Sequence, residues 1–316
     1  MKKIDSKIQP KFFDLLEFVD KIKLSNDVLF HLTDVNKQFE QYLKLLGEYA
    51  EYDEFSILFY WLNNTQKELV SSGKVECSKF LFTNEELLKG DLFFEKLNIT
   101  PKGIKDIHRF VCEHSKVNNG VSVGEYRKQP VWRGNYLPDG KPNIKWWGVN
   151  PDDIEKFIKS YIDFYKYNSL KEIYSSPFLK AALAHILLLR IQPFGDGNSR
   201  TSRIIHNISF TSSINKIYGT KLKVSPLNIS KNIYVNKKLY RMLINNISFD
   251  SNQFDNDTIN DWLDFILDMY EEELYFQTDY IPGLAKSFET IKQMAHTSQD
   301  EALEIQKVRS LVKKLF

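Results

Sequence analysis

The residue types most suited to chemistry are concentrated in one short stretch, residues 192–203, which reads QPFGDGNSRTSR. Gly195 and Gly197 permit positive φ angles and a close approach of the backbone to a ligand. The stretch runs into a predicted helix, whose N-terminal N–H groups and dipole attract anions. Asp196 is its single carboxylate, and such a group in an anion site suits a Mg²⁺ ion that bridges it to phosphates. The stretch therefore predicts a site for the polyphosphate of a nucleotide.

Three side chains of the same stretch add to the predicted anion site. Asn198 can donate an amide hydrogen bond to a phosphoryl oxygen, and Arg200 and Arg203 lie on one helix face, from which they can reach further phosphate oxygens. The alternative is a glycine-rich turn followed by two solvated arginines, a combination that is common without any ligand. The apolar helix directly before the loop favours the anion site, because it places the loop over the core.

The loop is expected to lie between two central helices. Pro177 suits the first position of a helix, and residues 178–191 are apolar on nearly every face, which is typical of a helix at the centre of a bundle. Pro193 disfavours helical geometry at the residue before it, so this helix should end near Gln192. The second helix is predicted to begin at about residue 199.

Helical spacing dominates the rest of the chain, and one segment departs from it. Apolar residues recur with helical periodicity in residues 12–46, 55–70, 154–165 and 262–270. Residues 125–149 instead mix β-favouring aromatic residues with Pro and Gly around a Pro-Asp-Gly turn signal at 138–140, which predicts a short hairpin. The expected fold class is all-α with this one hairpin.

Composition restricts the function classes. Among 316 residues, 43 Lys and Arg against 41 Asp and Glu leave a net charge of +2, too small for a protein that coats nucleic acid. The most apolar window, residues 181–191, is far shorter than the roughly 20 residues of a membrane-spanning helix. Cys77 and Cys112 form neither a metal-ligand cluster nor a disulfide framework. No membrane association or specific nucleic-acid binding is expected, and the predicted location is cytoplasmic.

The stretch 192–203 resembles the signature loop of the Fic (Fido) family, His-Pro-Phe-x-Asp/Glu-Gly-Asn-Gly-Arg-x-x-Arg. Seven of its nine defined positions match, namely Pro193, Phe194, Asp196, Gly197, Asn198, Arg200 and Arg203. Residues 177–185 resemble the central helix of the family, and residues 124–134 resemble the entry to its β-hairpin flap. The resemblance covers roughly residues 100–245, and it implies a Fido helical bundle with N- and C-terminal helical extensions, divided here as 1–95, 96–250 and 251–316.

The resemblance implies an enzyme that binds ATP and transfers AMP to a hydroxyl group of a target protein. Asp196 would hold Mg²⁺, and Arg203 would contact the terminal phosphate. The remaining phosphate contacts would come from Gly195, Gly197, Asn198, Ser199 and Arg200. The flap around Val131 and Trp132 would align the target segment by strand-like pairing. A homo-oligomer is compatible with the sequence.

Two residues depart from the family pattern within the loop. Gln192 takes the place of the histidine that accepts the proton of the attacking hydroxyl, and an amide does not titrate near neutral pH. General-base assistance contributes about 10²–10⁴ in rate, so transfer is expected to be weak or lost while phosphate binding suffers less. Ser199 replaces the second glycine and narrows the backbone freedom beside the phosphates. His206, one turn after Arg203, is the alternative base, although a structural role is favoured for it.

A second resemblance lies upstream, within residues 66–77. Ser72 and Glu76 match the Ser/Thr-x-x-x-Glu pattern of the inhibitory helix of some Fic proteins, whereas Cys77 departs from the Gly/Asn that follows. In that scheme Glu76 pairs with Arg203 and blocks the terminal phosphate. The alternative is that Glu76 is an ordinary surface acid.

Three functions therefore remain open. The first is a nucleotidyltransferase with residual activity, and the second is an inactive module that binds nucleotide and acts in regulation or interaction. The third is a Fic-fold transferase or hydrolase of altered phosphate-ester specificity.

Overall fold

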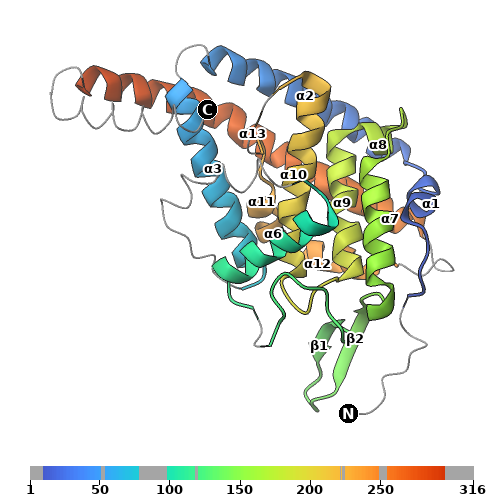
Figure 1. Cartoon of the computed structure of the whole chain (residues 1–316). Helices are drawn as coiled ribbons and strands as arrows, with labels where there is room; N and C mark the ends of the chain where they lie inside the picture. Colours follow the sequence, from blue (N-terminus) through green and yellow to red (C-terminus); the bar gives the residue numbers. More distant parts are fainter. Residues whose placement is uncertain are drawn as a thin grey trace.

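The computed structural model of the chain describes residues 10–50, 54–77, 98–117, 120–220, 222, 225–248 and 255–295. Most of these residues are helical, and two short strands form a hairpin, so the expected all-α fold with one hairpin is confirmed (Figure 1). The helices are α1 (Leu15–Asp20), α2 (Asn26–Ala50), α3 (Glu54–Val75), α6 (Pro101–His114), α7 (Ile154–Lys166), α8 (Glu172–Ser175), α9 (Pro177–Ile191), α10 (Asn198–Tyr218), α11 (Ser230–Val235), α12 (Lys237–Asn246) and α13 (Asn256–Ala295), with a 3₁₀ turn at Pro151–Asp153.

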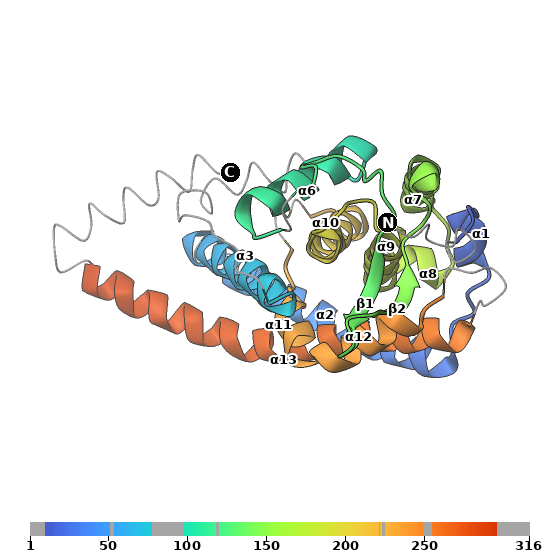
Figure 2. The ribbon, with the colours of Figure 1, turned by 90° about the horizontal axis from the view of Figure 1, so that it is seen from below.

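The centre of the bundle is the pair α9 and α10. Every residue of α9 is buried, as its nearly uniform apolar sequence predicts. Figure 2 shows both helices end-on, with α6 and α7 on one side, α2 and α13 on the other, and α3 beside α10. Ser176 begins α9, because its hydroxyl accepts the backbone N–H of Leu179 at 3.3 Å. The helix ends at Gln192, whose φ of 52° and ψ of 58° are left-handed, a conformation that non-glycine residues seldom adopt.

The N-terminal helices pack against the C-terminal one. The predicted helix over residues 12–46 is divided into α1 and α2 by the non-helical residues 21–25. The side chain of Asn256 at the start of α13 accepts the backbone N–H of Lys23 at 2.8 Å, and Asn260 accepts that of Ser25 at the same distance. The interruption between α1 and α2 leaves backbone N–H groups without helical partners. Side chains more than 230 residues away in sequence accept hydrogen bonds from two of these groups.

The hairpin consists of β1 (Trp132–Tyr136) and β2 (Pro142–Trp147), joined by the predicted turn. The strands are antiparallel, and their register shifts between Arg133 and Gly134, a β-bulge that changes the direction of the neighbouring side chains. Trp146 fixes the hairpin to the bundle: its indole N–H donates to Asn245 of α12 at 3.0 Å, and the guanidinium of Arg190 in α9 lies 3.9 Å from its ring centre.

No helix in the described part of the chain combines the length and hydropathy needed to cross a bilayer.

Candidate functional site

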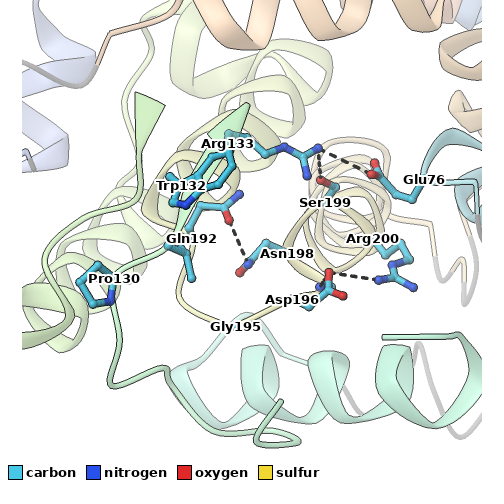
Figure 3. Close-up of a pocket in the computed structure, with 12 residues that line it drawn as sticks. Glu76, Pro130, Trp132, Arg133, Gln192, Gly195, Asp196, Asn198, Ser199 and Arg200 are labelled. Carbon is cyan, nitrogen blue, oxygen red and sulfur yellow. Dashed lines mark hydrogen bonds and ion pairs between the residues drawn. The ribbon is translucent and has the colours of Figure 1, made fainter. Parts of the chain in front are cut away.

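A pocket of about 280 Å³ lies where the hairpin, the loop after α9 and the end of α3 meet (Figure 3). It brings together most of the residues that the sequence nominates. Its lining consists of Glu76, Pro130, Val131, Trp132, Arg133, Gln192, Gly195, Asp196, Gly197, Asn198, Ser199 and Arg200. The residues contributed by the loop and the flap, and Glu76, therefore share one cavity, as the resemblance requires.

The loop is shaped by the side chain of Asn198, the first residue of α10. Its Oδ1 accepts the backbone N–H of Phe194 at 2.9 Å, and its Nδ2 donates to the carbonyl of Phe194 at 2.8 Å. This pair of bonds fixes which end of the amide is nitrogen, and the same nitrogen also donates to Oε1 of Gln192 at 3.2 Å. Asn198 was expected to donate to a phosphoryl oxygen, whereas here both hydrogens of its amide bind within the loop.

The side-chain amide of Gln192 is oriented by Asn198. Its Oε1 is identified as the acceptor by the bond from Asn198, so its Nε2 is the remaining donor. This nitrogen is buried and bonds to none of the residues that the structure describes, while the side chain lines the pocket. The backbone carbonyl of Gln192 accepts from Nε of the buried Arg127 at 2.6 Å, which secures the left-handed turn. The amide of Gln192 cannot take a proton near neutral pH.

Asp196 and Arg200 lie together on the opposite wall of the pocket. Oδ1 of Asp196 accepts the N–H of Gly197 at 2.6 Å and lies 3.5 Å from Nη2 of Arg200. The other end of the guanidinium donates to Oγ of Ser115 at 2.8 Å and to the carbonyl of Lys116 at 2.7 Å. Asp196 is one of two carboxylates that line the pocket, the other being Glu76, and Mg²⁺ is commonly held in proteins through one or two carboxylates together with substrate phosphates.

Arg203 is fully buried and is bound by the end of α3. Its Nε donates to Oγ of Ser72 at 2.8 Å, its Nη2 donates to the carbonyl of Ser72 at 2.8 Å, and its Nη1 lies 3.2 Å from Oε1 of Glu76. The contact that the upstream pattern predicted is therefore present. Glu76 lines the pocket whereas Arg203 does not. The carboxylate of Glu76 therefore separates the pocket from the guanidinium of Arg203.

The carboxyl group of Glu76 is ionised at neutral pH. Burial alone would raise its pKa, but the positive charges of Arg203 and Arg133 outweigh that effect and lower the pKa to about 2. A permanent negative charge therefore lies inside a cavity that Arg133 and Arg200 also line.

Two residues of the site were missed by the sequence reasoning. Arg133 of β1 lies 3.6 Å from Oε2 of Glu76 and donates to Oγ of Ser199 at 3.2 Å. His108 of α6 lies behind the loop: its Nδ1 accepts the N–H of Gly124 at 3.0 Å, so its Nε2 donates to the carbonyl of Asp196 at 2.9 Å. Burial lowers the pKa of His108 to about 4, which keeps the ring neutral. In the sequence, the one feature that could have singled out His108 is its position among the apolar residues of α6.

The structure gives His206 a structural position. Its Nε2 lies 2.6 Å from the hydroxyl of Tyr270, it is not among the residues lining the pocket, and burial lowers its pKa to about 3. The described residues thus place no ordinary histidine base at the pocket beside Gln192.

Comparison with known proteins agrees with this geometry. The Fic/DOC family model matches residues 98–209. The chain is 37% identical over 116 residues to a protein adenylyltransferase Fic of Drosophila willistoni, and 34% identical over 113 residues to that of Drosophila melanogaster. Each of these matches covers 36% of this chain and 20% of the relative, so the chain matches only a fifth of the length of these curated proteins.

Solved structures share the fold over most of the chain. A Fic family protein from Desulfovibrio desulfuricans G20 superimposes with a TM-score of 0.54 at 13% identity, covering 86% of this chain and 77% of that one. Fic-1 (aa134–508) from C. elegans gives a TM-score of 0.52 at 16% identity, covering 81% of this chain and 74% of that one. Residues 98–209 therefore match the Fic/DOC family, and the chain shares the fold of these Fic proteins.

Proposed function

We propose that the pocket binds ATP with Mg²⁺, and that the chain is a Fic-type nucleotide-binding protein whose AMP transfer is weak or absent. The observation that carries this proposal is that Asp196, Arg200 and the start of α10 line one cavity together with Gln192, whose amide offers no base. The curated relatives are adenylyltransferases, which supports a nucleotide as the ligand.

The phosphate chain would be held by the start of α10. Gly197, with a φ of 79°, turns the backbone into the helix, and a Cβ atom there would lie 3.2 Å from the side chain of Val111. The backbone N–H groups of the first helical turn and the guanidinium of Arg200 would bind phosphate oxygens. Asp196 would hold Mg²⁺, which would neutralise part of the phosphate charge when bound.

AMP transfer would form a bond between the hydroxyl oxygen of the target and the α-phosphorus, and it would release pyrophosphate. The hydroxyl must lose its proton during this step. The amide of Gln192 cannot take that proton, so only positioning and charge stabilisation by the other groups of the pocket would remain, without base assistance. The same reasoning favours, as a second candidate, an inactive module that binds nucleotide and acts through regulation.

The segment before the family match would control access to the pocket. Glu76 follows directly on α3, outside residues 98–209, and its carboxylate occupies the partner position of Arg203. We assign it the inhibitory role, together with Ser72. A target protein would dock at the flap beside Val131 and Trp132, where strand edges offer backbone pairing.

The experiment compares the natural protein with Glu76→Gly, Gln192→His and the double variant. We expect Glu76→Gly to tighten ATP binding at least tenfold in calorimetry, because a negative charge leaves the pocket. Labelled ATP should then mark the double variant, which has both a base and an open pocket. A Gln192→Asn, Glu76→Gly protein keeps an amide and serves as the matched control.

Two results would contradict the proposal. Absence of ATP binding in Glu76→Gly would show that the pocket does not take a nucleotide. Self-labelling of the natural protein at the rate of the double variant would show that Gln192 does not limit transfer.

A further inference from the structure

The flap contributes a charged group to the pocket that neither the family pattern nor the proposed function uses. Arg133 lies on β1 beside the register shift at Gly134, and a Cβ atom at Gly134 would lie 2.1 Å from the carbonyl of Asn143. The bulge therefore depends on glycine, and it sets the direction of the residue before it. Figure 3 shows the Arg133 side chain extending from the strand toward Ser199 and Glu76.

Arg133 and Arg203 share one carboxylate. Oε2 of Glu76 lies 3.6 Å from Nη2 of Arg133, and Oε1 lies 3.2 Å from Nη1 of Arg203. When one carboxylate bridges two guanidinium groups, the two groups are close enough to bind a single anion that has several oxygen atoms. A phosphate group meets this description and carries more negative charge than the carboxylate.

Ser199 holds Arg133 at this position. Its hydroxyl accepts from Nη2 of Arg133 at 3.2 Å, and it is the residue that stands where the family pattern has its second glycine. Glycine would have no side-chain acceptor for this bond. Ser199, which replaces the second glycine of the family pattern, therefore makes a contact between the loop and the flap that a glycine could not make.

We propose that Arg133 is a phosphate-binding residue of this pocket, positioned by Ser199 and occupied by Glu76 until a nucleotide displaces that carboxylate. The inference rests on the proposed function, since it assigns one more group to the same ligand. Glu76 then blocks two cationic groups at once, one on the flap and one in α10. Its displacement would leave Arg133, Arg200 and Arg203 around the phosphates, with Asp196 as the acidic partner for Mg²⁺.

The test is ATP, ADP and AMP binding, measured by calorimetry in the Glu76→Gly background with and without Arg133→Gln. Loss of Arg133 should weaken ATP binding about tenfold, ADP binding less, and AMP binding not measurably, because the residue contacts the distal end of the phosphate chain. Ser199→Ala should weaken ATP binding by a smaller factor in the same order of nucleotides. Lys145→Gln removes one positive charge from an exposed position of β2 outside the pocket and is the matched control.

The outcomes separate this role from the proposed function. ATP binding within twofold of the Glu76→Gly protein, or an equal loss for all three nucleotides, would overturn the assignment of Arg133 while leaving the pocket as a nucleotide site. Lack of binding in the Glu76→Gly protein itself would overturn the proposed function, and the role of Arg133 with it.

Discussion

Two helices approach the same loop and the start of α10, and they bind it in different ways. From α6, His108 donates to the loop carbonyl of Asp196 and stacks on Phe194, with 3.7 Å between the ring centres. From the end of α3, Ser72 and Glu76 bind the guanidinium of Arg203. One helix therefore supports the backbone of the loop, whereas the other takes up a charge beside it.

The difference agrees with the extent of the family domain. Helix α6 lies inside residues 98–209 and α3 lies outside them. Helix α3 also makes a buried polar contact with the bundle, where the carboxylate of Glu68 accepts both the backbone N–H and the hydroxyl of Ser230 at the start of α11. The contact that supports the loop backbone thus lies inside the family match, while the carboxylate that binds the neighbouring guanidinium lies outside it.

The largest expected effect tests the α6 side. Phe194→Ala should lower the free energy of unfolding by about 3–5 kcal/mol, because the ring is fully buried and its loss leaves a cavity against His108. Urea denaturation measures the change. Phe30→Ala in α2 is the control, since that ring is 74% exposed and its removal should cost little. A loss below about 1 kcal/mol for Phe194→Ala would mean that the stack does not support the loop.

The second effect uses pH to distinguish the two sides. The pKa of His108 falls from its ordinary 6.5 to about 4 through burial, so between these values the unfolded chain takes up a proton that the folded protein does not. Its contribution to stability is present above pH 6.5 and decreases toward pH 4, by up to about 3 kcal/mol. The Glu76 carboxyl, with a pKa of about 2, contributes its full stability down to about pH 4.5 and loses it only below that.

The measurement is the free energy of unfolding against pH for the natural protein and for His108→Gln. The difference between the two curves cancels groups that change in the opposite direction, such as Glu273, whose pKa burial raises to about 7. We expect the natural protein to lose more stability than the variant from pH 6.5 to 4. Parallel curves would show that His108 is not held neutral by the fold.

Sequence reasoning identified the elements that depend on local patterns. Residues 178–191 are apolar on nearly every face and form the central helix, and the Pro-Asp-Gly turn joins the two strands. The candidate site residues of the loop could also be selected from the sequence, because they all lie within the short stretch 192–203. Ser72 and Glu76 were recognised as a short pattern, and their contact with Arg203 is present in the structure.

What the sequence could not supply depends on segments that are distant along the chain. The break between α1 and α2 is satisfied by Asn256 and Asn260, which no local pattern connects to residues 21–25. The loop carbonyl of Asp196 accepts from His108, which lies 88 residues earlier in a different helix. Arg133 reaches Glu76 only because the hairpin folds over the end of α3, so its sequence position alone gave no reason to select it.

The smallest expected effect tests the α3 side. Ser72→Ala removes the hydroxyl that accepts from Nε of Arg203, at a cost of about 1–2 kcal/mol, since the carbonyl of residue 72 and Glu76 still bind the guanidinium. Amide hydrogen exchange should become faster in α3 and remain unchanged in α6. Ser71→Ala, one position earlier and half-buried, is the matched control. If amide exchange became equally faster in both helices, α3 would not open independently of α6. The proposed difference between the two helices in how they bind the loop region would then be wrong.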